Sequence, residues 1–239
     1  NILFVKKNKI YSPKNKIYKG INYNFFKIKL NNLISKDIKI NSLNTYDEIV
    51  AWAERIRQQF DTEIKEIPLK NLRNWNVGSN KIAHSSGKFF EVLGFRVGSN
   101  SIREVEAGWD QPIIKEHGFD GGVLCLLRTY IEELPHYLIQ ARFEPGNYNH
   151  IQLSPTLQAT FSNLNQEHGG NKPPYSEFFE DYSKNQNEYI FNEWLAEDGG
   201  KFYFKRNRGL VKQVDYENTY LLNDSFMWLS LFQIKKLLE

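Results

Sequence analysis

The sequence has a single cysteine, Cys125, among its 239 residues. One cysteine cannot form a disulfide within the chain, and the apolar segment around it contains no group that would activate a thiol. We therefore expect a buried, inert side chain in a reducing compartment, with a catalytic thiol as the alternative. The five histidines and the cysteine also lack the spacing of zinc ligands, so neither a metal nor another cofactor is predicted.

Long apolar runs are also missing from the sequence. No segment approaches the roughly 20 apolar residues that cross a bilayer. The N-terminal residues show no apolar core with a small-residue cleavage site. These absences predict a cytoplasmic protein with no membrane partner. The net charge is only +3, which gives no indication of nucleic-acid binding.

Charge is distributed unevenly along the chain. Residues 1–40 are rich in Lys and Asn and poor in acid, whereas the balance turns slightly acidic from Asn41 onward. We predict a basic N-terminal arm or accessory hairpin at 1–40 and one folded domain at 41–239. Lysine runs are usually solvated, which favours a packing arm over a contact with an anionic ligand.

Helical and strand periodicities alternate in the domain. Thr45 and Glu48 form a capping box ahead of a helix predicted at 46–59. Further helices are predicted at 176–182 and 225–238. Strands are predicted at 88–97, 122–130, 136–143, 189–195, 201–204 and 210–214. This mixture predicts an α+β fold in which a mixed β-sheet is sandwiched by helices.

The segment Gln140–Asn163 is polar and has strand periodicity. Hydrogen-bonding side chains alternate there with small or apolar ones, and Glu144-Pro145-Gly146-Asn147 is a turn signal between two predicted strands. Burying so dense a polar face costs free energy unless a partner supplies hydrogen bonds. We infer that the segment binds a ligand rich in hydroxyl groups, and a solvated sheet face is the alternative.

Two other segments combine polar side chains with a restricted backbone. Pro112 forces Gln111 into an extended conformation near Trp109, which favours contact with a ring-shaped ligand. The glycine pair that follows His168 allows the backbone to approach a ligand closely.

A basic cluster, Lys205-Arg206-Asn207-Arg208, stands out in the C-terminal half. Arginine makes bidentate contacts to phosphate oxygens, so the cluster predicts an anion site, most simply for a diphosphate. A solvated basic turn is the alternative.

Residues 103–108, REVEAG, partly match the end of the Nudix phosphohydrolase box. The upstream Glu and Gly positions of that box fall on Phe95 and Phe89. The carboxylates that would hold Mg²⁺ are therefore incomplete, and Nudix hydrolysis is excluded.

Five ordered blocks resemble the NDP-hexose 2,3-dehydratase family. They are GWDQPII at 108–114, QARFEPGNYNHIQLSPTLQAT at 140–160, HGG with a following PPY at 168–175, FKRNRGLV at 204–211 and FMWLSLFQIKKLL at 226–238. SGKFFEVLGFRV at 86–97 is similar to the family's early strand pair. The resemblance starts near Leu43, and Arg142 and Leu157 stand where Lys and Val are expected.

This resemblance implies a domain similar to the Nudix fold but without the hydrolase box. It also implies elimination of water across C2–C3 of a nucleotide-linked, typically dTDP-linked, 4-keto-6-deoxyhexose in deoxysugar biosynthesis. Such a site needs a base near C3, an acid near the C2 oxygen, donors for the 4-oxyanion and a diphosphate clamp, but no redox cofactor. A bacterial surface polysaccharide is the favoured destination of the sugar.

Catalytic roles follow from the implied chemistry. Glu144, at a rigid Glu-Pro turn, is the expected base if it is partly desolvated, with a turn carboxylate as the alternative. His168 and His150 are the expected acids, and His136 is expected to be structural. A metal-assisted variant would require Glu144 and the two expected acids to converge.

Substrate contacts are expected from polar and aromatic residues in the matching blocks. They are Trp109, Gln111, Gln140, Arg142, Asn147, Gln152, Gln158, Lys205, Arg206 and Arg208. Gln140, Gln152 and Gln158 share one face if the strands are regular and suit the sugar hydroxyls. Arg142, Arg206 and Arg208 are the expected diphosphate ligands.

Family members usually carry the repeat twice in tandem, whereas this chain carries it once. A homodimer that rebuilds the pair, half of a longer chain and a degenerate single domain are the three interpretations, and the homodimer is preferred. Two functional alternatives stay open: a non-catalytic nucleotide-sugar-binding half of a larger enzyme, and a sugar-nucleotide epimerase, because proton abstraction at C3 is shared.

Overall fold

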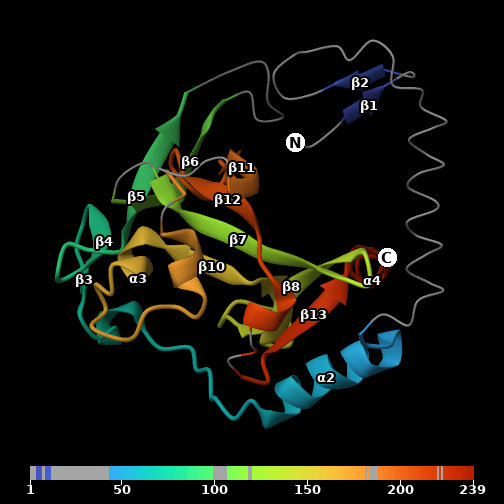
Figure 1. The fold of residues 1–239 in the computed structure, drawn as a ribbon. Coiled ribbons are helices and arrows are strands. Elements are labelled where there is room, and N and C mark those ends of the chain that lie inside the picture. Colours follow the sequence, from blue (N-terminus) through green and yellow to red (C-terminus); the bar gives the residue numbers. More distant parts are fainter. Residues whose placement is uncertain are drawn as a thin grey trace.

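A computed structural model describes residues 4–6, 9–11, 43–98, 107–117, 120–180, 182–183, 188–219, 221 and 223–239 (Figure 1). The helices are α2 (Tyr46–Gln59), α3 (Phe161–Leu164) and α4 (Leu231–Leu237), with short 3₁₀ helices η1 (Leu69–Asn71), η2 (Ser176–Phe179) and η4 (Tyr216–Asn218). The strands are β1 (Phe4–Lys6), β2 (Lys9–Tyr11), β3 (Trp75–Val77), β4 (Lys81–His84), β5 (Phe90–Val97), β6 (Trp109–Glu116), β7 (Asp120–Ile131), β8 (Leu134–Phe143), β9 (Ile151–Pro155), β10 (Leu157–Thr160), β11 (Tyr189–Ala196), β12 (Arg206–Gln213) and β13 (Phe226–Ser230).

The strands of the domain form two sheets. A four-stranded antiparallel sheet has the order β3-β4-β5-β6. A seven-stranded sheet has the main order β11-β12-β7-β8-β13, with β10 paired to β7 and β9 paired to β8. Because β12 runs parallel to β7 while the other pairs are antiparallel, this sheet is mixed and the α+β prediction is confirmed.

The seven-stranded sheet has a hydrophobic core on each side. The first core contains Val123, Cys125 and Leu157 of the sheet, with Phe161 of α3 and Phe179 of η2 packed on them. Burial raises the pKa of the Cys125 thiol, in line with the inert side chain that we predict. We call this side of the sheet the first-core side.

The second core lies on the opposite side. Ile49 and Trp52 of α2 and Ile234 of α4 pack there against Ile139 and Leu229 of the sheet. Few of the described helices cover the sheet. None of the described helices is long and apolar enough to cross a membrane. The longer helices α2 and α4 lie on the second side, which we call the helix-covered side, whereas the short α3 and η2 lie on the first-core side.

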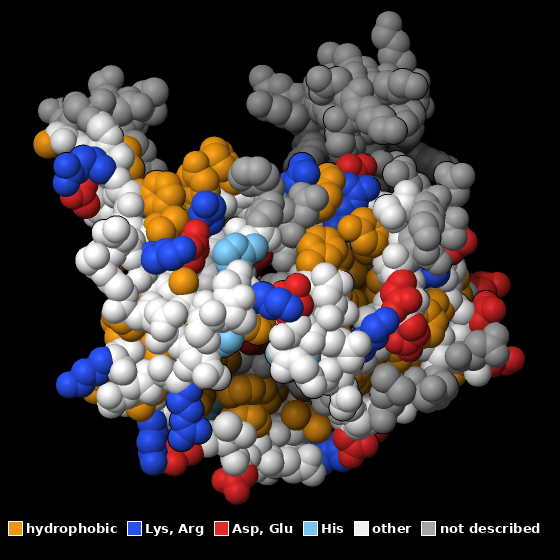
Figure 2. Space-filling model, turned by 90° about the vertical axis from the view of Figure 1, so that its left-hand side faces the viewer, with side chains coloured by type: hydrophobic (Ala, Val, Ile, Leu, Met, Phe, Trp, Pro, Cys, Tyr) orange, Lys and Arg blue, Asp and Glu red, His pale blue; other side chains and the backbone are white. Residues whose placement is uncertain are grey.

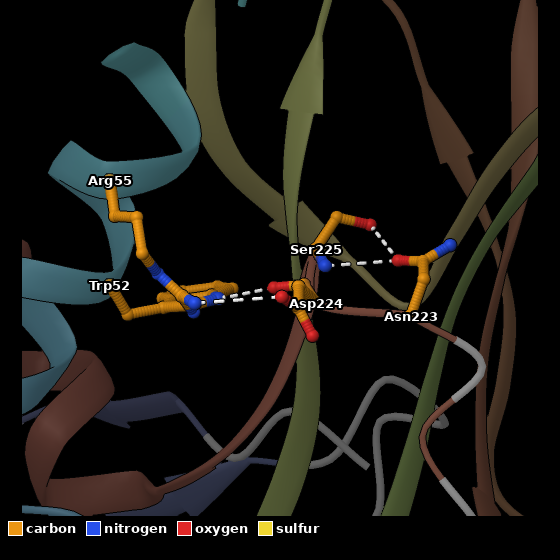
Figure 3. Close-up of polar contacts among 5 residues, drawn as sticks. All are labelled: Trp52, Arg55, Asn223, Asp224 and Ser225. Carbon is orange, nitrogen blue, oxygen red and sulfur yellow. Dashed lines mark hydrogen bonds and ion pairs between the residues drawn. The ribbon is translucent and has the colours of Figure 1, made fainter. Parts of the chain in front are cut away.

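Helix α2 begins and ends as the sequence predicts. The Thr45 hydroxyl accepts a hydrogen bond from the Glu48 N–H, and the Glu48 carboxylate accepts one from the Thr45 N–H, which confirms the capping box. Figure 3 shows how α2 is joined to the turn before β13: Trp52 Nε1 donates to the Asp224 carbonyl at 2.6 Å, and Arg55 pairs with the Asp224 carboxylate. The turn thus holds α2 over the sheet.

A fork in the seven-stranded sheet separates β7 from β8. The two strands pair only near their hairpin, and then β9 pairs with β8 while β10 pairs with β7. Buried Thr156 lies where β9 passes into β10; its hydroxyl donates to the Leu138 carbonyl at 2.5 Å and accepts from the Leu127 N–H at 3.0 Å. One hydroxyl therefore satisfies both strands where their ladder ends.

The predicted helix at 225–238 is wrong over its first half. Residues 226–230 form strand β13, which pairs with β8, and only Leu231–Leu237 are helical. Ser230 starts α4 through a second capping box with Gln233. The apolar residues there fit both periodicities, and the free edge of β8 favours the strand.

Two further local predictions need correction. The strand predicted at 201–204 is a turn joined to β6 by the isolated bridge Ile114↔Phe202, and the strand begins instead at Arg206. The predicted helix at 176–182 is the shorter η2. Most of residues 1–40, and the partial Nudix match at 103–106, lie outside the described residues.

Candidate functional site

The turn after β8 gathers several of the predicted site residues. Arg142 Nε donates to Glu144 Oε1 at 2.6 Å, and Asn147 Nδ2 contacts the Arg142 carbonyl at 3.5 Å. Gln140 and Arg142 lie two residues apart on β8 and so face the same side. Gln140 is the cross-strand partner of Phe226 in the first core. The side chains of Gln140 and Arg142 therefore project to the first-core side.

Glu144 differs from the expected buried base. Its side chain is 41% exposed, and Arg142 neutralises it. The carboxylate is held in place by an ion pair rather than by a dry pocket.

His150 lies in the same turn, where its φ of 65° is left-handed. The ring lies 6.1 Å from that of Phe60, and Phe60 stacks on Phe143 in the second core. His150 therefore turns toward α2, away from Gln140 and Arg142. This position separates it from Glu144's side of the strand.

The glutamines do not all share one side of the sheet. Gln152 is the cross-strand partner of Arg142, so it projects to the first-core side. Leu157 and Ala159 are buried in the first core, so Gln158 between them projects to the opposite side. The predicted common face is therefore wrong for Gln158. Thr156, at the fork, shifts the inward–outward alternation of side chains by one residue.

His168 lies in the exposed loop after α3. Its Nδ1 accepts a hydrogen bond from the Gly170 N–H at 2.8 Å. The neutral ring that fits this bond carries its proton on Nε2. With Nδ1 engaged as an acceptor, Nε2 is the ring nitrogen of His168 that can donate a hydrogen bond to another group.

Trp109 and Gln111 lie on β6, in the four-stranded sheet. Trp109 Nε1 donates to Gln111 Oε1 at 2.5 Å, and Gln111 Nε2 donates to the Gly200 carbonyl at 2.8 Å. These bonds join β6 to the β11–β12 turn. Both polar groups of Gln111 are thus engaged within the protein.

Lys205 is not available as a diphosphate ligand. Its ammonium lies 2.6 Å from the Glu116 carboxylate, and the two side chains are only 12% and 14% exposed. A Cβ on Gly121 would meet both partners at under 3.0 Å, so the glycine makes room for this pair. The basic cluster is therefore divided, because its first cation is consumed in a structural ion pair.

Arg206 and Arg208 project from β12 beside Trp194 of β11. Their guanidinium carbons lie 4.1 Å and 5.1 Å from the Trp194 ring centroid. Arg208 is the parallel-strand partner of Val123, which places it on the first-core side. The Arg208 guanidinium also donates to the Asn192 side chain and, at 3.1 Å, to the Asn192 carbonyl. We call these four residues the Arg–Trp platform.

A hollow of about 250 Å³ adjoins the platform on the same side. Val123 and Leu157 form its floor, Phe161 and Phe179 its walls, and the Lys172–Glu180 ion pair contributes to its lining. The Tyr182 carbonyl, at the lining, accepts from Asn192 of the platform. A pocket of this size and apolar lining suits one ring of a ligand.

Basic side chains are otherwise dispersed. On the face in Figure 2, blue Lys and Arg side chains lie beside red Asp and Glu side chains, and no continuous basic surface is visible among the described residues. Among the residues that the structure describes, no group of three or more His, Cys, Asp or Glu side chains is placed to hold a metal ion.

A larger groove of about 670 Å³ lies on the helix-covered side. Leucines and isoleucines of β9, β13 and α4 line it, with Tyr148 at its edge. Leu238, at one side, is 83% exposed. Its composition resembles that of a protein contact surface more than that of a polar ligand site.

Sequence reasoning missed several residues of the platform and hollow. Trp194 and Asn192 belong to a strand that was predicted, yet only the register with β12 puts them opposite Arg208 and Leu210. Glu180 and Lys172 come together across a loop. The alternation of IFNEWLA was the one signal available, and it does not identify the partner strand.

Known proteins match this chain over most of its length, including the segments that form the hollow and the platform. A family model described as NDP-hexose 2,3-dehydratase covers residues 46–239. A dTDP-4-dehydro-6-deoxy-alpha-D-glucopyranose 2,3-dehydratase of Saccharopolyspora spinosa is 35% identical over 202 residues, which is 83% of this chain and 40% of the relative.

A relative with the same name from Amycolatopsis orientalis is 34% identical over 203 residues, 81% of this chain and 41% of its own length. The chain thus spans about 40% of the curated relatives that it matches. Since the family model extends over most of the chain and includes the turn after β8, the hollow and the platform, the chain belongs to the NDP-hexose 2,3-dehydratase family.

Proposed function

We propose that this chain provides the catalytic domain of a dTDP-4-keto-6-deoxyhexose 2,3-dehydratase, a carbon–oxygen lyase of deoxysugar biosynthesis. The main support is that Arg142, Gln140, Gln152 and Arg208 project to the first-core side of the sheet, the side on which the ring-sized hollow opens. Cations and amides in this arrangement match a ligand with a diphosphate and several hydroxyls.

The proposed reaction begins with proton removal from C3, which the neighbouring 4-keto group acidifies. Glu144 is the proposed base, and the proton passes to its carboxylate while negative charge develops on the C4 oxygen. Arg142, 2.6 Å from Glu144, would lie beside that charge. His168 Nε2 is the proposed donor to the oxyanion or to the departing C2 oxygen.

Elimination then breaks the C2–O bond. The electron pair of the enediolate forms the C2–C3 double bond, and the C2 hydroxyl leaves as water after it receives a proton. The resulting enol takes up a proton at C2 and releases the proton of its C3 hydroxyl, which gives the 3,4-diketo-2,6-dideoxy sugar. The balance is loss of one water molecule, with no net oxidation or reduction.

A vicinal diketone can be trapped, which gives a direct test. The chain is incubated with dTDP-4-keto-6-deoxyglucose and an aromatic 1,2-diamine, which condenses with the product to a quinoxaline measured by absorbance and mass. We expect adduct from the native chain and little from Glu144→Gln. Deuterium uptake at C3 without adduct would instead support the epimerase alternative.

Glu144 and the Arg–Trp platform lie on different strands of one copy, and the relatives are much longer. We therefore propose that a second copy, preferably in a homodimer, completes the site and packs on the 670 Å³ groove. Light scattering coupled to size exclusion should give a dimer mass. Ile234→Glu, on the groove, should reduce that mass to the monomer's.

Two finer assignments also belong to this proposal. Similarity to the Nudix fold is supported by the mixed sheet with a helix-covered side. Cytoplasmic location is supported by the need for a nucleotide-linked substrate.

A further inference from the structure

A second hollow lies at the opposite end of β7 from the hollow beside the platform. It has a volume of about 520 Å³, and its lining comes from the end of β7, the end of β12 and the 3₁₀ helix η4. Val123 of β7 lines the first hollow, and Thr129 of the same strand lines the second. Six residues of a β-strand span about 20 Å, so the two hollows are separate places. The proposed reaction does not use the second hollow.

Thr129 provides the second hollow with a hydroxyl group that has no partner. The residue is only 2% exposed. It shares the alternation of Cys125 and Leu127 on β7, so its side chain projects to the first-core side, where the hollow opens. No described residue makes a hydrogen bond with this hydroxyl. Burial of a polar group without a partner costs free energy, which a bound ligand can recover.

The rim of the second hollow is acidic. Three exposed carboxylates line it, and none of them forms an ion pair with a described residue: Glu132, Asp215 and Glu217. Arg128 lies beside them, but its guanidinium donates to neutral groups, the Tyr130 hydroxyl at 2.5 Å and Gln213 Oε1 at 3.0 Å. Three carboxylates against this guanidinium leave the rim with a net negative charge, which attracts cations and repels anions.

Two tyrosines add aromatic surface to the same hollow. Tyr130 is 53% exposed and Tyr216 is 40% exposed, and both line it. The Arg128 guanidinium carbon lies 4.7 Å from the Tyr130 ring centroid, so this ring already contacts one cation. Tyr216 packs against buried Trp228, with 6.2 Å between the ring centroids, which holds its ring at the wall of the hollow. Aromatic rings of this kind bind apolar stems and cationic heads.

The combination matches an ammonium group on a short apolar stem. An ammonium has three N–H donors and no acceptor, and the hollow offers it carboxylate and hydroxyl oxygens. A metal ion fits less well, because no three His, Cys, Asp or Glu side chains of the described residues are placed to hold one. A neutral apolar ligand would leave the Thr129 hydroxyl without a partner.

We propose that the second hollow binds a small alkylammonium ion, whose head contacts the Thr129 hydroxyl and the acidic rim and whose stem packs on Tyr216. This site does not depend on the proposed function. The nucleotide sugar is an anion that binds at the other end of β7, whereas this ligand is a cation. The chain would therefore carry two ligand sites of opposite charge preference on the first-core side of one sheet.

Calorimetric titration with pentylammonium chloride tests the site, and 1-pentanol is the matched ligand with the same stem and no charge. At low salt, the native chain should bind pentylammonium at least about tenfold more tightly than 1-pentanol. Asp215→Asn/Glu217→Gln should remove most of that preference. Glu66→Gln, which neutralises an exposed carboxylate outside the hollow, should keep it. Equal affinity of the native chain for the two ligands, or an unchanged preference in the double variant, overturns the proposal.

Thr129 variants separate a binding role of the hydroxyl from a structural one. Thr129→Val keeps the shape of the side chain, and no described group loses a hydrogen bond. This variant should therefore unfold at the same urea concentration as the native chain or at a higher one, yet bind pentylammonium at least about threefold more weakly. Thr129→Ser retains the hydroxyl and should bind like the native chain. A Thr129→Val variant that unfolds at lower urea and binds pentylammonium normally would assign the hydroxyl to the fold and contradict the site.

The ammonium site and the dehydratase reaction are tested separately. Pentylammonium binding that depends on Asp215 and Glu217, without quinoxaline adduct, would support the site and count only against the reaction. Adduct formation by a chain that does not bind pentylammonium would support the reaction and overturn the site. Asp215→Asn/Glu217→Gln should form adduct at the native rate, because both residues lie at the far end of β7 from Arg208.

Discussion

Lys205 and Arg208 are three positions apart in one basic cluster, but the structure treats their charges in opposite ways. Lys205 is nearly buried at the junction between β6 and β12, 2.6 Å from the Glu116 carboxylate. Arg208, on β12, contacts only neutral groups among the described residues, Asn192 and Trp194. One charge is neutralised within the protein, and the other is presented at its surface.

This difference teaches how a basic cluster should be interpreted. A cation whose carboxylate partner is buried with it stabilises the fold, since removal of one partner leaves an uncompensated charge. A cation with neutral partners contributes little to folding and is available to a ligand. Substitution of Lys205 should therefore mainly lower stability, whereas substitution of Arg208 should mainly affect ligand binding.

The largest effect on stability is expected at the buried pair. Lys205→Met should lower the free energy of unfolding by about 3–5 kcal/mol, because Glu116 would remain buried without a counter-charge. Urea unfolding followed by fluorescence measures the change. The double variant Lys205→Met/Glu116→Leu should recover most of it. A loss below about 1 kcal/mol for the single variant would remove the contrast with Arg208.

Thr156 extends the contrast to a neutral interior group. Thr156→Val keeps the shape but leaves the Leu127 N–H and the Leu138 carbonyl without their hydroxyl partner. We expect a loss of about 1–3 kcal/mol in unfolding free energy. Thr156→Ser retains the hydroxyl and should lose less. Faster hydrogen exchange at the Leu127 amide in the Val variant alone would locate the effect at the fork.

Glu91 offers a version of the ion pair in which the carboxylate is buried and the lysine is half-exposed. The Lys81 ammonium, 2.7 Å away, lowers the pKa of this carboxyl from its ordinary value of 4.5. The group therefore stabilises the fold above pH 4.5, and this contribution is lost as the pH falls through the lower folded value. Lys81→Met should reduce the acid-dependent part by about 0.2–1 kcal/mol. An unchanged pH profile of unfolding would contradict the assignment.

The smallest effect on stability is expected at Arg208. Arg208→Met should change the free energy of unfolding by less than about 0.5 kcal/mol, because no described carboxylate loses a partner. The same urea experiment measures it. A loss as large as that of Lys205→Met would mean that the platform is structural, and the comparison between the two cations would fail.

Local signals predicted the elements that depend on neighbours in sequence. The Thr45–Glu48 capping box sets the start of α2, because both hydrogen bonds form within one turn. The segment 226–238 was harder, since its apolar residues satisfy both periodicities. Pairing of Phe226 with Gln140 decides for a strand, and that pairing joins residues far apart in the sequence.

The predictions for the site also differ according to whether they depend on local alternation or on contacts between distant strands. Gln140, Gln152 and Gln158 were predicted to share one face, and the pairing of β8 with β9 places Gln140 and Gln152 on the same side of the sheet. Gln158 was misplaced because a single residue at the fork, Thr156, reverses the alternation. Trp194 was missed because its contacts with Arg206 and Arg208 depend on the register between β11 and β12, which the sequence pattern does not give.

The sequence by itself determined the α+β character, the helix start at Thr45, the polar segment after β8 and the family resemblance, because each depends on composition or on residues close along the chain. Tertiary structure alone decided which cations are neutralised, where β7 and β8 part, and which side chains meet at the hollow. These depend on strand register and burial, since contacts between distant segments determine whether a charge or a hydroxyl finds its partner inside the protein.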